Sequence, residues 1–176
     1  MPLFVNYRIP LRALDTVAAV QEMLQQHGVQ GDWQMLHRSH ITLAVYDNLP
    51  YSRLSDIKLR MAATLAEVPS FTLSFEGLGT FDNANDRIIW LRPAPYLPLL
   101  NLHQRLSWLD VSDNRFPVYQ PHVTLATKAN DVELPSIEIP AVTFNCDEVI
   151  LSSDLHGVSY QILEVFPLKT KRLLRG

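Results

Sequence analysis

The pattern of hydrophobic and polar positions predicts a succession of short helices and strands. Apolar residues recur at steps of three and four in three segments, which is the spacing of an amphipathic helix. These helices are residues 11–27, ended by Gly28; a segment capped by Ser52 or Ser55 and ended by Pro69; and a segment carrying Leu99, Leu102, Leu106 and Leu109. Alternating and β-branched residues predict strands at 4–9, 40–46, 71–75, 87–91, 122–126, 149–153 and 161–166.

The connections between these elements indicate the fold class. Residues 82–86 form a hairpin loop, and residues 131–140 form a loop with two prolines and several acidic residues. Gly77 and Gly79 interrupt a strand pattern and so mark a bend or bulge. They do not form a dinucleotide-binding loop, because the third glycine and the following helix of that motif are missing. No linker or low-complexity segment divides residues 1–176, so we expect a single α+β domain with mainly antiparallel sheet.

Composition and charge limit which binding partners, metal sites and cellular compartments are expected. The chain of 176 residues is 47 % hydrophobic and 19 % charged, as in an ordinary globular protein. A net charge of −3 argues against broad binding to long duplex DNA, which relies on many Lys and Arg contacts. Cys146 is the single cysteine, so no intrachain disulfide and no cysteine-based metal site is expected. With no signal peptide and no membrane-length apolar run, we expect a cytoplasmic monomer.

One five-residue pattern occurs twice. His40-Ile41-Thr42-Leu43-Ala44 is repeated 82 residues later as His122-Val123-Thr124-Leu125-Ala126. Side chains on a strand alternate between two faces. The histidine, threonine and alanine of each copy are therefore expected on one face, and the β-branched residue and leucine on the other.

Two such strands around one cleft would suit phosphodiester chemistry. In-line displacement at phosphorus needs one base and one acid, and histidine serves either task near neutral pH. The hydroxyls of Thr42 and Thr124 are expected to bind the non-bridging oxygens. A lone strand histidine is more often structural, but the duplication favours catalysis by His40 and His122. Neither a metal nor a cofactor is expected.

On these residues the chain resembles the two-histidine (2H) phosphoesterase superfamily, and most closely its RNA 2',3'-cyclic phosphodiesterase or 2'-5' RNA ligase (LigT-like) branch. The resemblance covers nearly the whole chain and also rests on these supporting residues: Leu3-Phe4-Val5, Gly79-Thr80-Phe81, Ile88-Ile89-Trp90-Leu91, Pro121, Leu151-Ser152-Ser153, Tyr160 and Phe166-Pro167-Leu168.

The resemblance implies a bilobal α+β fold of two pseudo-symmetric, mainly antiparallel sheets flanked by helices, with the active cleft between the lobes. It implies His40 and His122 as the catalytic pair and Thr42 and Thr124 as phosphate ligands. It also implies hydrolysis of 2',3'-cyclic phosphate ends of RNA to a 2'-phosphate, with 2'-5' ligation as the reverse of related chemistry.

Three departures from this branch motivate a second hypothesis. Val45-Tyr46-Asp47, Gln120 and Thr127-Lys128 stand where the branch often has an aromatic and a glycine, a histidine, and an arginine. The substrate of the same two histidines would then be a small cyclic nucleotide, a 2'-5' oligonucleotide or an ADP-ribose cyclic phosphate. A third hypothesis is a non-catalytic module that binds RNA ends or nucleotides.

Several other residues have weaker signals. Tyr46 and Tyr119 flank the motifs and would stack on a base, although packing is the commoner role of such aromatics. Lys128 would attract a phosphate, although a solvated lysine is the more common case. His37 is interpreted as a loop histidine and His103 as a surface residue of the third helix.

Overall fold

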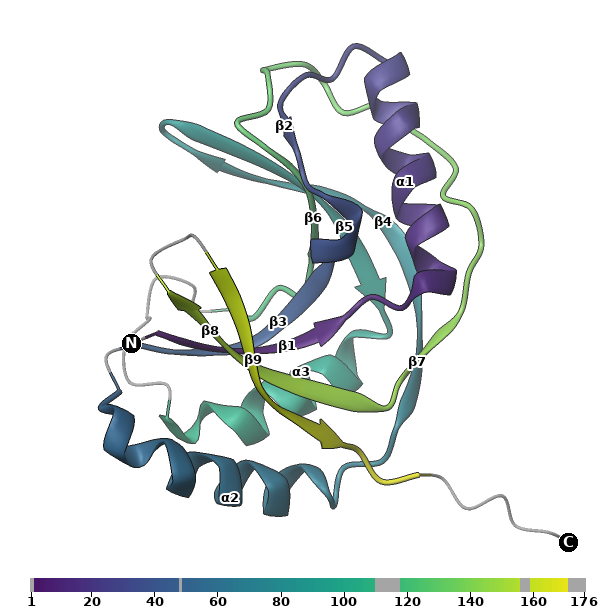
Figure 1. Cartoon of the computed structure of the whole chain (residues 1–176). Helices are drawn as coiled ribbons and strands as arrows, with labels where there is room; N and C mark the ends of the chain where they lie inside the picture. Colours follow the sequence, from purple (N-terminus) through teal and green to yellow (C-terminus); the bar gives the residue numbers. More distant parts are fainter. Residues whose placement is uncertain (1, 48, 110–117, 156–158, 171–176) are drawn as a thin grey trace, which may run out of the picture.

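The computed structural model describes residues 2–47, 49–109, 118–155 and 159–170, which form two antiparallel sheets (Figure 1). The first has the order β3-β1-β8-β9 and contains β1 (Leu3–Arg8), β3 (His40–Tyr46), β8 (Glu148–Leu155) and β9 (Ser159–Pro167). The second has the order β2-β6-β5-β4-β7 and contains β2 (Asp32–Trp33), β4 (Phe71–Asn83), β5 (Asp86–Ala94), β6 (Val123–Thr127) and β7 (Phe144–Cys146). The expected α+β fold with two antiparallel sheets is confirmed.

Three helices follow the predicted apolar spacing, with shifted ends. They are α1 (Leu11–Gln26), α2 (Leu54–Leu65) and α3 (Tyr96–Leu106), with short 3-10 turns η1 (Leu36–Arg38), η2 (Tyr51–Arg53) and η3 (Ser107–Leu109). Pro10 and Pro95 directly precede α1 and α3. The predicted serine caps of α2 are wrong, because Arg53 occupies the N-cap position and Ser55 lies inside the helix. None of the helices in the described part of the chain is long and apolar enough to cross a membrane.

Helices α1 and α3 each follow a strand of one sheet in the chain and contact a strand of the other sheet. Helix α3 comes before β6 in the chain but packs against β3 in the other sheet. Helix α1 comes before β3 but reaches β6, where the Gln21 side-chain amide donates to the Leu125 carbonyl at 3.1 Å. Figure 1 shows α2 and α3 together on one side of the first sheet and α1 beside the second. The two halves are therefore interlocked.

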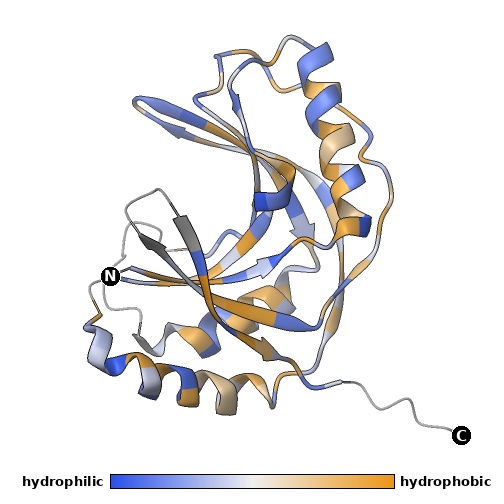
Figure 2. Cartoon of the chain, in the orientation of Figure 1, coloured by the Kyte–Doolittle hydropathy of each residue, from blue (hydrophilic) through white to orange (hydrophobic). Residues whose placement is uncertain are grey.

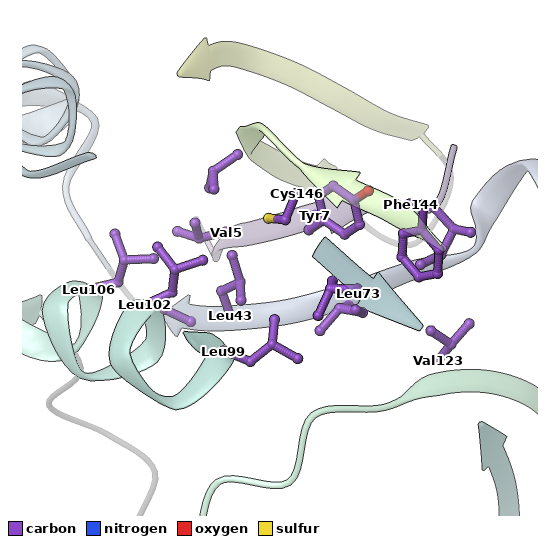
Figure 3. Close-up of a cluster of buried hydrophobic side chains, with 14 of the residues drawn as sticks. Val5, Tyr7, Leu43, Leu73, Leu99, Leu102, Leu106, Val123, Phe144 and Cys146 are labelled. Atoms are coloured by element: carbon purple, nitrogen blue, oxygen red, sulfur yellow. The ribbon is translucent and has the colours of Figure 1, made fainter. Parts of the chain in front are cut away.

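A single hydrophobic cluster joins the two sheets. In Figure 3 the α3 residues Leu99, Leu102 and Leu106 lie against Leu43 and Val5, and all five are fully buried. Figure 2 shows that α2 is amphipathic, because hydrophobic and hydrophilic residues alternate with the turns of the helix.

Contacts between β1 and β7 connect the two sheets directly. Tyr7 stacks on Phe144 with ring centroids 6.2 Å apart, and its hydroxyl donates to the Asn145 carbonyl at 2.8 Å. Both strands β7 and β2 were missed by the sequence patterns, since segments of three and two residues carry too little alternation to be recognised.

Both motif strands carry a β-bulge at the leucine of the motif. Between β1 and β3 the register passes from Val5↔Ala44 to Asn6↔Thr42, so Leu43 has no opposite partner. Between β5 and β6 the register passes from Ile89↔Ala126 to Trp90↔Thr124, so Leu125 also has no opposite partner. A bulge interrupts the alternation of side chains and bends the strand.

The bulges overturn one expectation about the motifs. The alanines were predicted on the same face as the histidines and threonines, but Ala44 is 4 % exposed and Ala126 is 0 % exposed, whereas Val45 and Thr127, which follow them, are half-buried. The phase of alternation therefore changes after each leucine. The duplicated sequence produces a duplicated bulge, so the repeat extends from residue type to backbone shape.

Candidate active site

The fold brings the two motif histidines into the same region. His40 is the first residue of β3, His122 directly precedes β6, and these two strands approach each other. Both side chains are half-buried. Positive charge on His40 contributes to lowering the pKa of His122.

Each histidine is held by the same local hydrogen bond. His40 Nδ1 lies 2.7 Å from the Arg38 carbonyl oxygen, and His122 Nδ1 lies 2.9 Å from the Gln120 carbonyl oxygen. In both cases the partner is two residues earlier in the chain. A carbonyl oxygen only accepts, so each Nδ1 must donate. The proton is thereby fixed on Nδ1, and Nε2 of both rings is left for chemistry.

Burial governs the charge of both rings. The pKa of His40 is lowered chiefly by burial, and the Arg8 guanidinium lowers it further, against the opposing effect of the bond to Arg38. The pKa of His122 is also lowered chiefly by burial, with the charge of His40 adding to the effect and the bond to Gln120 opposing it. Both imidazoles are therefore biased towards the neutral form at pH 7.

Aromatic rings form one wall of the site and hold His122 in place. Phe81 meets the imidazole edge-on, with ring centroids 4.9 Å apart, and the Trp90 ring lies 6.0 Å away. Trp90 lies across Gly79 of the neighbouring strand, where a Cβ atom would come within 2.3 Å of the indole. Gly79 is thus required for a close approach, which explains one of the two glycines noted in the sequence.

The motif threonines lie beside the histidines with their side chains half-buried. Thr42 is opposite Asn6 on β1, and Thr124 is opposite Trp90 on β5. Within the described residues, neither threonine hydroxyl has a hydrogen-bond partner. Both hydroxyls are therefore available to donate to an oxyanion.

Tyr119 and His103 together hold the backbone of the first motif. Their rings stack with centroids 4.1 Å apart and an interplanar angle of 5°. The Tyr119 hydroxyl donates to the Thr42 carbonyl at 2.7 Å, and His103 Nδ1 donates to the Leu43 carbonyl at 2.7 Å. The interpretation of His103 as a surface residue is wrong, because its ring binds the carbonyl at the bulge. Burial raises the pKa of the Tyr119 phenol, which keeps it a donor.

Two of the weaker candidates lie away from the histidines. Tyr46 is 0 % exposed, and its hydroxyl donates to the Leu106 carbonyl at 2.6 Å, so it belongs to the core and offers no surface to a base. The bulge at Leu43 is the reason, since strict alternation would have kept Tyr46 on the face of His40. Lys128 lies six residues beyond His122, roughly 20 Å along an extended strand, and its Nζ is 3.6 Å from Asp32. Its ammonium group is paired with an exposed aspartate, and a role in phosphate binding stays a prediction.

Two arginines that the sequence reading missed lie beside the histidines. Arg8 pairs with His40 in the register of β1 and β3. Leu91 pairs with Val123, which places Arg92 next to the position of His122 at the end of the ladder. The guanidinium carbon of Arg92 lies 5.7 Å from the Trp90 ring centroid. No local motif marks either arginine, because only strand register brings them to the site.

His37 lies in η1 and is exposed, as expected for a loop histidine. In the part of the chain that the structure describes, no group of three or more His, Cys, Asp or Glu side chains is placed to hold a metal ion.

Comparisons with known proteins bear on the family and the fold of the chain. The model of the 2'-5' RNA ligase superfamily matches residues 8–157. The chain is 28 % identical over 142 residues to an RNA 2',3'-cyclic phosphodiesterase from Geobacillus stearothermophilus, covering 73 % of this chain and 45 % of that protein. The chain therefore matches less than half the length of that relative.

Solved structures show the same fold at low sequence identity. The crystal structure of E. coli LigT in its apo form superposes with a TM-score of 0.75 and 20 % identity, covering 96 % of this chain and 97 % of that one. E. coli LigT complexed with 3'-AMP gives a TM-score of 0.71 and 21 % identity, covering 94 % and 96 %. The expected bilobal fold with two sheets is confirmed by these similarities.

Proposed function

Because the chain belongs to the 2'-5' RNA ligase superfamily, we propose that it is a metal-independent phosphoesterase that hydrolyses 2',3'-cyclic phosphate ends of RNA to a 2'-phosphate. One observation carries the proposal: both motif histidines donate Nδ1–H to the carbonyl two residues earlier and so present Nε2 in the same way. A pair of equivalent, electrostatically coupled imidazoles is suited to acid–base chemistry on two sides of one phosphorus atom.

The reaction uses one histidine as base and the other as acid. The neutral imidazole takes a proton from water through Nε2 while the water oxygen bonds to phosphorus. The bond from phosphorus to O3' breaks, and the protonated imidazole gives its Nε2 proton to that oxygen. The product keeps the phosphate on O2'. The same steps, with the 5'-hydroxyl of a second RNA in place of water as the attacking group, would join two ends through a 2'-5' linkage; their reverse would cleave that linkage and restore the cyclic phosphate.

The threonines and the surrounding charges complete the mechanism. Thr42 and Thr124 donate their hydroxyl protons to the non-bridging oxygens, on which negative charge increases in the transition state. The negative charge of the substrate also favours the protonated imidazole that burial disfavours. The lowered pKa values favour two neutral rings, and a bound phosphate anion raises the pKa of the nearby imidazole until it carries the proton that the acid must supply.

The related proteins support this choice of substrate. The Geobacillus stearothermophilus relative is an RNA 2',3'-cyclic phosphodiesterase. The LigT structure with bound 3'-AMP shows that a protein of this fold accepts a nucleotide with a phosphate on the ribose. A cyclic phosphate on the same ribose has the same size and one fewer charge.

Turnover of an oligonucleotide ending in a 2',3'-cyclic phosphate, in the presence of EDTA, tests the proposal. We expect His40→Ala and His122→Ala each to lower kcat by roughly a hundredfold or more, the usual loss for a general acid or base. His37→Ala is the matched control, since this exposed histidine lies three residues before His40 and outside the site. We also expect a bell-shaped pH dependence.

Two results would contradict the proposal. Loss of activity in EDTA with recovery on adding a divalent ion would show that a metal is needed. Full activity in either motif variant would show that the histidines are not the acid and base.

A further inference from the structure

A cavity of about 370 Å³ lies beside His122. Its wall includes two prolines, Pro93 and Pro121, and the side chains that matter for a ligand are those of Glu76, Arg92, Tyr96, Val118, Tyr119 and Gln120. The volume falls in the range of small-ligand sites.

The cavity shares its wall with both motifs. Gln120 supplies the carbonyl that accepts the Nδ1 proton of His122. Tyr119 reaches the Thr42 carbonyl with its hydroxyl. A ligand group in this cavity would therefore be a neighbour of a phosphate held between the two histidines.

Two charged side chains of opposite sign face this cavity. Arg92 pairs with Gly77 across β4 and β5, and a Cβ atom at Gly77 would lie 3.9 Å from the guanidinium Nη1. Glu76 is the bulged residue of β4, where the register passes from Phe75↔Pro93 to Gly77↔Arg92. Among the residues described, neither Arg92 nor Glu76 has a hydrogen bond or an ion pair.

This combination suits a nucleobase better than a second phosphate. A carboxylate would repel a phosphate, whereas a base offers both donors and acceptors along its edges. Tyr96 is 38 % exposed, and its hydroxyl donates to the Tyr119 carbonyl at 2.9 Å, which fixes the orientation of the ring. Aromatic side chains commonly stack on bases in single-stranded RNA sites.

We propose that the cavity binds the base of the nucleotide carrying the reacting phosphate, and that Glu76 and Arg92 select guanine. Guanine presents O6 and N7 as acceptors, which is the pair that arginine most often binds. Its N1–H and exocyclic amino group are adjacent donors that match the two oxygens of one carboxylate. This inference rests on the proposed function, because the phosphate between the histidines fixes which base reaches the cavity.

The test compares kcat/KM for the 2',3'-cyclic phosphates of guanosine, inosine and adenosine. Inosine lacks the exocyclic amino group but keeps N1–H, O6 and N7. We expect wild type to prefer guanosine over inosine, and inosine over adenosine, by roughly tenfold in total or more. Glu76→Gln should remove the difference between guanosine and inosine. Arg92→Met should reduce the preference of both over adenosine and leave the part that comes from the N1–H bound by Glu76.

Matched controls are Glu67→Gln and Arg53→Met, because both residues are exposed and lie outside the cavity and the motifs. We expect these variants to keep the wild-type base preference. The changes at Glu76 and Arg92 should appear mainly in KM, since the acid and base are untouched. Equal kcat/KM on all three bases in wild type, or equal losses on all three in both cavity variants, would overturn the proposal.

A binding measurement separates this proposal from the proposed function. Calorimetry would compare the 3'-monophosphates of guanosine and inosine. Tighter binding of the guanosine form that depends on Glu76, without turnover of any cyclic phosphate, would support the cavity and contradict the phosphodiesterase. Turnover of all three cyclic phosphates with equal binding of the two monophosphates would support the phosphodiesterase and contradict the selection of guanine by the cavity. No binding and no turnover would overturn both.

Discussion

Burial and the two backbone carbonyls decide how the motif histidines enter the reaction. With Nδ1 committed to the Arg38 and Gln120 carbonyls, only Nε2 exchanges protons with substrate. Burial lowers both pKa values, so the base is ready at neutral pH while the acid depends on charge brought by the substrate. Arg8 lies outside the motifs, and its charge lowers the pKa of His40 directly.

Replacing Arg8 by glutamine should raise the pKa of His40. A positive guanidinium opposes protonation of a neighbouring imidazole, so its removal makes the imidazolium easier to form. Titration of the two histidines by NMR would measure the change, and the limb of the pH–rate profile that His40 controls should move to higher pH with it. Arg12→Gln, on the exposed surface of α1, is the control. An unchanged or lower pKa for His40 would contradict the electrostatic role of Arg8.

At the scale of the element, the site depends on strands that depart from regular pleating. At the bulges the carbonyls of Leu43 and Leu125 accept from a helix side chain, His103 of α3 in one case and Gln21 of α1 in the other. The Leu125 carbonyl also accepts from the Gln34 backbone N–H. On β4 the absence of a side chain at Gly79 lets the Trp90 ring of β5 lie across the strand. The position of Trp90, and through it the wall of the His122 site, is set by Gly79.

Gly79→Ala and Gly77→Ala should therefore behave differently. An alanine at 79 would place Cβ 2.3 Å from the Trp90 ring, whereas at 77 the nearest atom is Arg92 Nη1 at 3.9 Å, an ordinary contact. We expect the change at 79 to cost about 1–3 kcal/mol of stability, as overpacking does, and to lower kcat/KM by moving Trp90 against His122. The change at 77 should cost less than about 0.5 kcal/mol.

Urea denaturation followed by circular dichroism would measure both free energies of unfolding. Stability of Gly79→Ala equal to that of wild type would show that the indole has room to move.

At the scale of the whole molecule, sequence patterns located the elements but not their partners. The helices at α1 and α3 and the strands carrying the motifs follow from local spacing. The exchange of helices between halves does not, since the face of α1 that contains Val17 would suit either sheet. The same limit applies to the site: His40 and His122 were found because their motif is local, whereas Glu76 and Arg92 face one cavity only through a bulge and strand register.

The exchange of helices predicts how the molecule unfolds. The first sheet packs on α3, which lies between two strands of the second sheet in the chain, and the second sheet is bonded to α1, which lies between β1 of the first sheet and β2 of the second. Tyr7 and Phe144 bring the two sheets into one hydrophobic cluster. If either sheet opened, the other would lose the helix or the cluster that covers it. The two sheets should therefore unfold together.

Native-state hydrogen exchange would measure this cooperativity without altering the chain. Val5 lies on β1, which has a neighbour on each side in the first sheet, and Leu91 lies on β5, which has a neighbour on each side in the second. We expect their amides to exchange with opening free energies that agree within about 1 kcal/mol and approach the global value, as in the most protected cores. The urea-derived free energy of unfolding supplies that global value. An opening free energy several kcal/mol lower in one sheet would instead show that this half unfolds on its own, and that α1 or α3 can be released without loss of the sheet on which it packs.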